Sequence, residues 1–399
     1  MSACGTYSAG VGVTCNLTDP YRWGHYQAAD LVTFSKVEAM EWARSRNQSV
    51  TWHFNDKIFG AIDTRIEPHT SLSDLYQSRA RQISNSYDYV VLFYSGGADS
   101  HNMLESFLHA NARFDEIVSL HNLATDQNPQ GVFNREIFNT AVPYVDGLKT
   151  QGRLSAAVPH RLLDMSNIIA EFNNAIDWHT YPYLANTCYS INNIARGWLR
   201  SYVQEWQQII DQGKTLALVW GHDKPRVAHD NNFYFCFMDV IDNCVGVWQQ
   251  INQPNGWFDE LFYTTSDMPE IVIKQAHVIK KFLELAPEHH DWLTDHVTGL
   301  GHVIKHRPDG TWVARWLRQD AQSLLIYPWW DQTLYYEPKP LDTIRSLRDR
   351  WFWSDPMLST GFNAAVDSLE QTWHGQWLHV VPEQNIRAVN TFRSCRYWL

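Results

Sequence analysis

The alternation of apolar runs with helical patterns in the middle of the chain predicts an α/β fold. Residues 89–94 form a continuous apolar run, typical of a strand buried on both faces, and a helical pattern follows over 100–112. The same alternation predicts strands at 116–120, 155–159 and 215–220, with helices at 134–148 and 191–210. Such a pattern indicates a parallel sheet whose ligands bind beyond the carboxyl ends of its strands.

The pattern differs on either side of this central part. Before it, the chain predicts a helix at 36–46, short strands at 49–54 and 58–63, and a helix at 71–83. No internal repeat or flexible linker marks a boundary. We therefore place the boundaries where the pattern changes. This divides the chain into an N-terminal α+β cap (1–85), a central α/β domain (86–285) and a tryptophan-rich C-terminal region for substrate binding or packing (286–399).

Composition and charge narrow the classes of protein to consider. With 44% hydrophobic residues, the 399-residue chain has enough apolar material for a sizeable core. Its net charge of −11 repels phosphate backbones, so nucleic acid is not an expected partner. The apolar runs are strand-sized, and the first fifteen residues do not resemble a secretory signal. We expect a cytoplasmic protein without a membrane segment, whose six scattered cysteines are reduced thiols.

A glycine turn follows the first predicted strand of the central domain. Its residues include Ser95, Gly96, Gly97, Asp99 and Ser100, and a helical pattern comes directly after them. Tandem glycines expose consecutive N–H groups, and the start of the helix directs its unpaired N–H groups at the same point, so this turn predicts an anion site. Asp99 would repel bare phosphate, and its presence therefore favours a nucleotide complexed with a divalent cation, Mg²⁺.

This strand, turn and helix resemble the pyrophosphate loop of the PP-loop ATP pyrophosphatases, and in particular the synthetase domain of asparagine synthetase. Neither the Walker pattern nor the dinucleotide pattern of glycines is present. The resemblance extends from residue 87 to 122 and more weakly to about 285. It implies a five-stranded parallel sheet of the PP-loop/HUP type with helices on both faces, and cleavage of ATP to AMP and pyrophosphate.

A second polar cluster follows the strand predicted at 215–220. It contains Asp223, Lys224 and Arg226, and because both clusters end parallel strands we expect them to face one crevice. The resemblance implies that Asp223 joins Asp99 in holding Mg²⁺. Lys224 and Arg226 are candidates for binding the nucleotide phosphates or a substrate carboxylate.

A helix predicted to open near residue 265 carries the remaining catalytic candidate. Lys274 lies on a different face of this helix from its apolar stripe. The resemblance implies a lysine that stabilises the α-phosphate during attack on the adenylate, and Lys274 is our candidate for it. A solvent-exposed helix face explains the residue equally well.

The expected activity is ATP-dependent adenylation of a carboxylate or carbonyl oxygen, followed by attack of ammonia or an amine. The acceptor is a small molecule or nucleotide, and a separate glutaminase could supply the nitrogen, because the N-terminal segment is too short for a glutaminase domain. The first alternative is tRNA or nucleobase thiolation, which would need Cys188 or Cys236 as a catalytic thiol. Another is a nucleotide-binding module without turnover. The histidine-rich segment 289–306 and the C-terminal tryptophans are weaker candidates, for zinc binding and base stacking.

Overall fold

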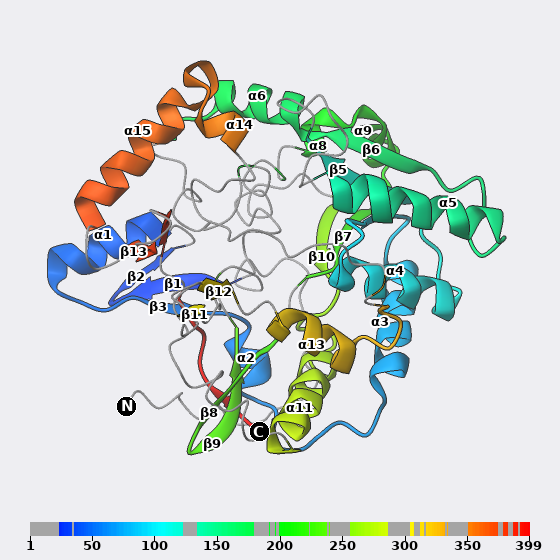
Figure 1. The fold of residues 1–399 in the computed structure, drawn as a ribbon, viewed down its shortest axis with the longest axis horizontal. Helices are drawn as coiled ribbons and strands as arrows, with labels where there is room; N and C mark the ends of the chain where they lie inside the picture. The colour runs from blue at the N-terminus through cyan, green and yellow to red at the C-terminus, as the bar shows by residue number, and fades with distance from the viewer. Residues whose placement is uncertain are drawn as a thin grey trace.

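The structure of the chain is a computed structural model, shown in Figure 1. It describes the following residues: 24–33, 36–122, 134–178, 191, 196, 199–222, 224–237, 239, 256–285, 304–306, 312–314, 317–331, 333, 350–373, 378–381, 386–389 and 392–399. Among these, no helix is both long and apolar enough to cross a membrane.

A five-stranded parallel sheet organises the central domain. Its strands are β4 (Tyr89–Phe93), β5 (Glu116–His121), β6 (His160–Asp164), β7 (Leu216–Trp220) and β10 (Trp257–Leu261). The strand order is β10-β7-β4-β5-β6, and every neighbouring pair is parallel, as the sequence predicts. The chain extends the sheet from β4 in one direction and then returns to extend it from β4 in the other. The carboxyl end of β4 is therefore the topological switch point, where sheets of this type form a ligand crevice.

The burial of the central strands explains their continuous apolar runs. All five residues of β7 are buried, as are four of the five in β4. Phe93 and Trp220, at the carboxyl ends of these two strands, are register partners whose rings stack with centroids 3.7 Å apart. The two strand ends are thus held side by side.

Helices cover this sheet. Three of them pack together, namely α3 (Leu72–Ser86), α4 (Ala98–Ala110) and α11 (Glu270–Leu285), and α13 (Leu317–Ile326) packs on α4 and α11. On β7 lies α9 (Gln204–Asp211), whose Trp206 meets Phe93 edge to face. The chain moves along the sheet in opposite directions in the connections that contain α4 and α9. Right-handed crossovers therefore place these two helices on opposite faces.

Smaller antiparallel sheets accompany the central sheet, and Figure 1 shows them to the left of β7 and β10. One contains β1 (His25–Ala28), β2 (Leu31–Thr33) and β3 (Thr51–His53), beside α1 (Lys36–Arg46). Another contains β8 (Arg226–Asp230), β9 (Asn232–Cys236) and β15 (Tyr397–Trp398). Through β15, the end of the chain joins the segment that follows β7. Other described elements are α5 (Val142–Thr150), α6 (Met165–Ala175), α8 (Leu199–Tyr202), α14 (Arg350–Trp353), α15 (Pro356–Trp373), and the pairs β11 (Ile304–His306) with β12 (Trp312–Ala314) and β13 (Leu378–Val381) with β14 (Ile386–Val389).

Three predicted elements differ from the structure. The prediction of a strand at 58–63 is wrong, because the short helix α2 (Asp56–Phe59) overlaps the start of this segment and is followed by turns. The third strand of the sheet lies at 160–164 rather than 155–159. The helix expected over 191–210 is interrupted at Val203, whose backbone is extended (φ −94°, ψ 95°) between α8 and α9.

Candidate functional site

The sheet order brings the two loops of interest into contact. Residues 95–97 follow β4 and residues 221–222 follow β7, its hydrogen-bonded neighbour. A Cβ atom built on Gly221 would lie 2.9 Å from both the carbonyl oxygen of Asp99 and the Cα of Ser100. Only a glycine at 221 allows so close an approach. The first turn of α4 and the loop after β7 are therefore in direct contact at the switch point.

The glycine turn after β4 is packed closely against the segment that precedes α5. Gly96 has a φ of +84°, and a Cβ there would lie 2.8 Å from the carbonyl oxygen of Glu136. Gly97 is the N-cap of α4, and a Cβ there would lie 2.5 Å from the Glu136 side chain. Glu136 opens a π-helical turn, η2 (Glu136–Ala141), a rare conformation that often occurs near functional sites. The turn therefore needs glycine at position 96 for conformation as well as for space.

Two serine hydroxyls close the same turn. The Ser100 hydroxyl lies 3.1 Å from the Ser95 hydroxyl and donates to the carbonyl oxygen of Gly97 over 3.1 Å. It also accepts from the backbone N–H of Ser95, while the Ser95 hydroxyl accepts from the N–H of Gly97. In this structure both serines stabilise the loop itself. Their hydroxyls could reach a phosphate only by exchanging these hydrogen bonds.

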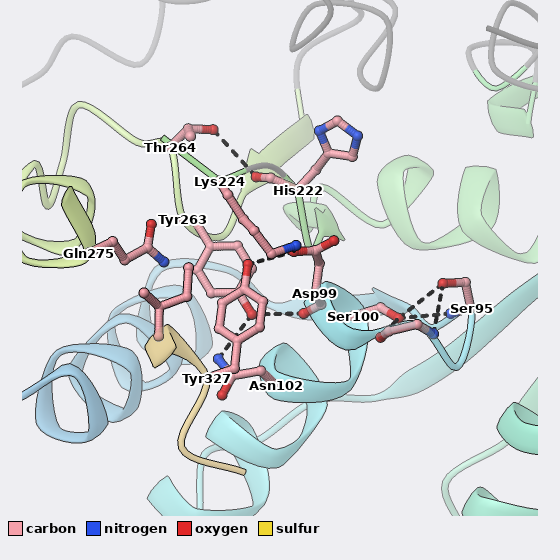
Figure 2. A network of polar contacts seen from close by, with 12 residues as sticks. Ser95, Asp99, Ser100, Asn102, His222, Lys224, Tyr263, Thr264, Gln275 and Tyr327 are labelled. Carbon is pink, nitrogen blue, oxygen red and sulfur yellow. Dashed lines mark hydrogen bonds and ion pairs between the residues drawn. The ribbon is translucent and has the colours of Figure 1, made fainter. Parts of the chain in front are cut away.

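Asp99 is the centre of the polar network in Figure 2. Its carboxylate oxygen Oδ1 accepts from Lys224 Nζ over 2.5 Å and from the Tyr327 hydroxyl over 2.5 Å. Burial by itself would raise the pKa of Asp99, but the ammonium of Lys224 and these hydrogen bonds hold that pKa below its usual value. The Lys224 side chain is 4% exposed and that of Asp99 32%. Asp99 is therefore an ionised carboxylate at the edge of the crevice, paired with a buried cation.

Two further residues fix the backbone of the first turn of α4. The Tyr263 hydroxyl donates to the carbonyl oxygen of Asp99 over 2.7 Å and accepts from the Asn102 amide over 3.0 Å. Both Tyr263 and Asn102 are fully buried. The position of Asp99 is thus set by its main chain as well as by its side chain.

The described residues can supply a magnesium site of the type that nucleotides complete. No three histidine, cysteine, aspartate or glutamate side chains form a metal-binding group in the described part of the chain. Mg²⁺ bound with a nucleotide commonly takes one or two carboxylates, the remaining ligands being phosphate oxygens and water. Asp99 fits this role, because only one oxygen of its carboxylate, Oδ1, accepts hydrogen bonds from the described side chains, and Oδ2 accepts none. Asp223, the other predicted metal ligand, lies outside the described residues.

Of the remaining predicted site residues, Lys274 contacts Glu67 rather than Asp99, and Arg226 lies in β8. Lys274 Nζ donates to Glu67 over 2.7 Å and to the carbonyl oxygen of Pro68 over 2.9 Å. Burial raises the pKa of Glu67, but the ammonium groups of Lys274 and Lys281 outweigh it and hold the pKa at about 2. Lys274 is therefore committed to a peripheral ion pair. Arg226 begins β8, where its backbone pairs with Cys236.

The weaker candidates acquire ordinary structural roles or lie outside the described residues. Cys236 is a buried free thiol in β9, and burial raises its pKa, which disfavours a reactive thiolate. Trp329 and Trp330 pack on histidines of α4, with the Trp329 ring stacked 4.8 Å from His109. Cys188 and residues 289–303 are outside the described part.

Sequence reasoning missed Tyr327, Tyr263 and Asn102, although all three contribute to the network around Asp99.

No family model, curated protein or solved structure matches this chain. The functional assignment therefore rests on the geometry of the site.

Proposed function

We propose that the chain is an ATP pyrophosphatase of the PP-loop type, which adenylates a carboxylate or carbonyl oxygen and transfers the activated group to ammonia or an amine. The observation that carries this proposal is the contact between Asp99 and Lys224 across the switch point of a parallel sheet. The glycine turn supplies backbone N–H donors for a nucleotide phosphate on one side of this contact, and Lys224 supplies a buried cation on the other.

The proposed reaction has two steps. In the first, a substrate carboxylate oxygen attacks the α-phosphorus of ATP, the bond from that phosphorus to the bridging oxygen breaks, and pyrophosphate leaves. In the second, the nitrogen of ammonia or an amine attacks the acyl carbon, AMP leaves with the carboxylate oxygen, and the nitrogen loses a proton. A kinase or a simple ATPase would release ADP instead.

Each residue of the site has a separate role in this reaction. Gly96 and Gly97 form the turn before α4, and the backbone N–H groups at the start of this helix would bind a phosphate. Asp99 would bind Mg²⁺, and the resemblance implies Asp223 as its second carboxylate; the ion, when present, neutralises charge on the departing pyrophosphate. Lys224 would stabilise negative charge that develops at the α-phosphate. We assign this role to Lys224 rather than Lys274 because Lys224 is the buried cation that touches Asp99.

Product analysis tests the proposal. The protein is incubated with α-labelled ATP, Mg²⁺, ammonium and a panel of carboxylates, and the nucleotides are separated by chromatography. We expect AMP and pyrophosphate. Main production of ADP would refute the assignment, and tight ATP binding with no turnover on any acceptor would favour a nucleotide-binding module.

Two matched lysine variants locate the catalytic cation. Lys224→Met should lower the rate of AMP formation by roughly 100-fold or more, the size expected when a principal charge contact to the transition state is lost. Lys274→Met removes the same charge at a peripheral ion pair and should leave that rate within about twofold. If Lys274→Met lowered the rate of AMP formation more than Lys224→Met, Lys274 would be the lysine that stabilises the α-phosphate, as the sequence suggested.

A further inference from the structure

We propose that Tyr327, from the C-terminal region, is a positioning residue of the metal site, which holds Asp99 Oδ1 so that Oδ2 receives the ion. This inference rests on the proposed function. The Tyr327 hydroxyl donates to Asp99 Oδ1 over 2.5 Å, across 228 positions of sequence. The region that the sequence left without a defined role thus contributes a direct contact to the crevice.

The Tyr327 ring is held in a buried aromatic cluster. Tyr327 is 1% exposed, its ring stacks on that of Tyr263 with centroids 5.1 Å apart, and Tyr76 and Trp329 complete the cluster. A buried tyrosine with neighbours on several sides has few alternative rotamers. Its hydroxyl therefore has a defined position before any ligand arrives.

Two similar hydrogen-bond chains fix both ends of the Tyr327–Asp99 contact. In one, the Asn102 amide donates to the Tyr263 hydroxyl, which donates to the carbonyl oxygen of Asp99. In the other, the Gln275 amide donates to the Tyr76 hydroxyl over 2.8 Å, and this hydroxyl donates to the carbonyl oxygen of Ile326 over 2.8 Å.

Each chain ends on a backbone carbonyl, one at Asp99 itself and one at the residue before Tyr327. The main chains of both partners are thereby held, so that the distance between hydroxyl and carboxylate depends little on loop motion.

A neutral donor suits a metal-binding carboxylate better than an ammonium group does. Lys224 and Tyr327 both donate to Oδ1, and Oδ2 accepts no hydrogen bond from the described side chains. A divalent cation on Oδ2 would be repelled by Lys224 at this distance, which favours movement of the lysine to a phosphate. Tyr327 carries no charge and can remain on Oδ1, where it keeps the carboxylate oriented when the ion is bound.

The test is calorimetric titration of the protein with preformed Mn²⁺–ATP, compared with a titration with metal-free ATP. Tyr327→Phe removes only the hydroxyl and should raise the dissociation constant of Mn²⁺–ATP about tenfold or more, as expected for a lost hydrogen bond to a charged group. The affinity for ATP without metal, measured in EDTA, should stay within about twofold. Tyr26→Phe is the matched control, because it removes a buried hydroxyl that donates to a different carboxylate, Asp239 Oδ2, over 2.9 Å and has no part in the network around Asp99.

The outcomes separate this inference from the proposed function. If the wild-type protein binds no Mn²⁺–ATP, both are refuted. If it does, an unchanged Mn²⁺–ATP dissociation constant in Tyr327→Phe refutes the inference alone, and so does an equal rise in Tyr26→Phe or an equal loss of metal-free ATP binding. If Tyr327→Phe does not fold, 4-fluorophenylalanine at position 327 takes its place, because its fluorine fills the space of the hydroxyl without donating a hydrogen bond, and the same weakening is expected.

Discussion

The ion pair between Arg79 and Glu260 provides a direct test of the packing between α3 and β10. Arg79 lies on α3 and Glu260 on β10, and each side chain is 2% exposed. Arg79 donates to Glu260 over 2.5 Å and to the carbonyl oxygen of Leu261 over 3.1 Å. The Tyr87 hydroxyl donates to the other oxygen of the Glu260 carboxylate. The change to make is Arg79→Met, which keeps the length of the side chain and removes its charge.

The expected loss follows from what the variant leaves behind. In Arg79→Met the Glu260 carboxylate stays buried without its cation, and Asp267, 3.7 Å from Arg79, loses the same neighbour. Removing one partner of a buried ion pair costs about 3–5 kcal/mol, whereas replacing both partners is often close to neutral. Since whole domains have unfolding free energies of roughly 5–15 kcal/mol, this single change should remove a large part of the total.

Urea unfolding of four variants measures this effect, namely Arg79→Met, Glu260→Gln, the variant with both changes, and Arg81→Met. Arg79→Met should lower the free energy of unfolding by about 3–5 kcal/mol, and adding Glu260→Gln should recover part of the loss. Arg81→Met, on the same helix, is the control. Arg81 is exposed and its hydrogen bond to Gln77 is long, at 3.3 Å, so Arg81→Met should change the free energy of unfolding by no more than about 0.5 kcal/mol. A loss below about 1 kcal/mol for Arg79→Met, or strict additivity in the double variant, would refute the reasoning.

Two further predictions concern the glycine turn and a buried histidine. Gly96→Ala should abolish ATP binding. It should also destabilise the fold by more than the roughly 1–2 kcal/mol that a positive φ costs, because its Cβ would meet the Glu136 carbonyl oxygen as well. Gly152→Ala is the control in urea unfolding, because Gly152 has a φ of +71° and no atom within 4 Å of its Cβ position, so this variant measures the cost of the φ alone. Burial lowers the pKa of His101 from its usual 6.5 to about 4, so the unfolded chain takes up a proton first as the pH falls and stability is lost between about pH 6.5 and 4. His101→Phe should remove about 2 kcal/mol of the difference in unfolding free energy between pH 7 and pH 5, and an unchanged difference would contradict the shifted pKa.

The parts of the fold that sequence predicts well are those whose signals are local. The apolar runs of β4 and β7 are continuous because both strands are central and buried on both faces. The turn at Gly96 and Gly97 requires a special backbone conformation, which tandem glycines reveal directly. For these reasons the switch point and the loops beside it could be located without a structure.

The parts that sequence misses depend on the tertiary environment. The third strand, β6, lies at the edge of the sheet, and its half-exposed residues, among them Leu162 at 38%, give no continuous apolar run. Lys224 and Lys274 look equivalent as isolated cations, and only the fold shows that one touches Asp99 and the other touches Glu67. Tyr327 lies in a run of aromatic residues with no local pattern that points to a carboxylate 228 positions earlier.

The contact between Tyr397 and Asp56 has a consequence for synthesis of the chain. The Tyr397 hydroxyl donates to Asp56 over 2.9 Å across 341 positions, and β15 pairs with β9 beside it. At a translation rate of about 5–20 residues per second, Asp56 waits roughly 20–70 s for its partner. During that time the neighbouring Phe59, buried against Tyr397 in the finished protein, lacks that cover. The nascent chain therefore has a long interval in which a chaperone that binds apolar segments would protect it from aggregation.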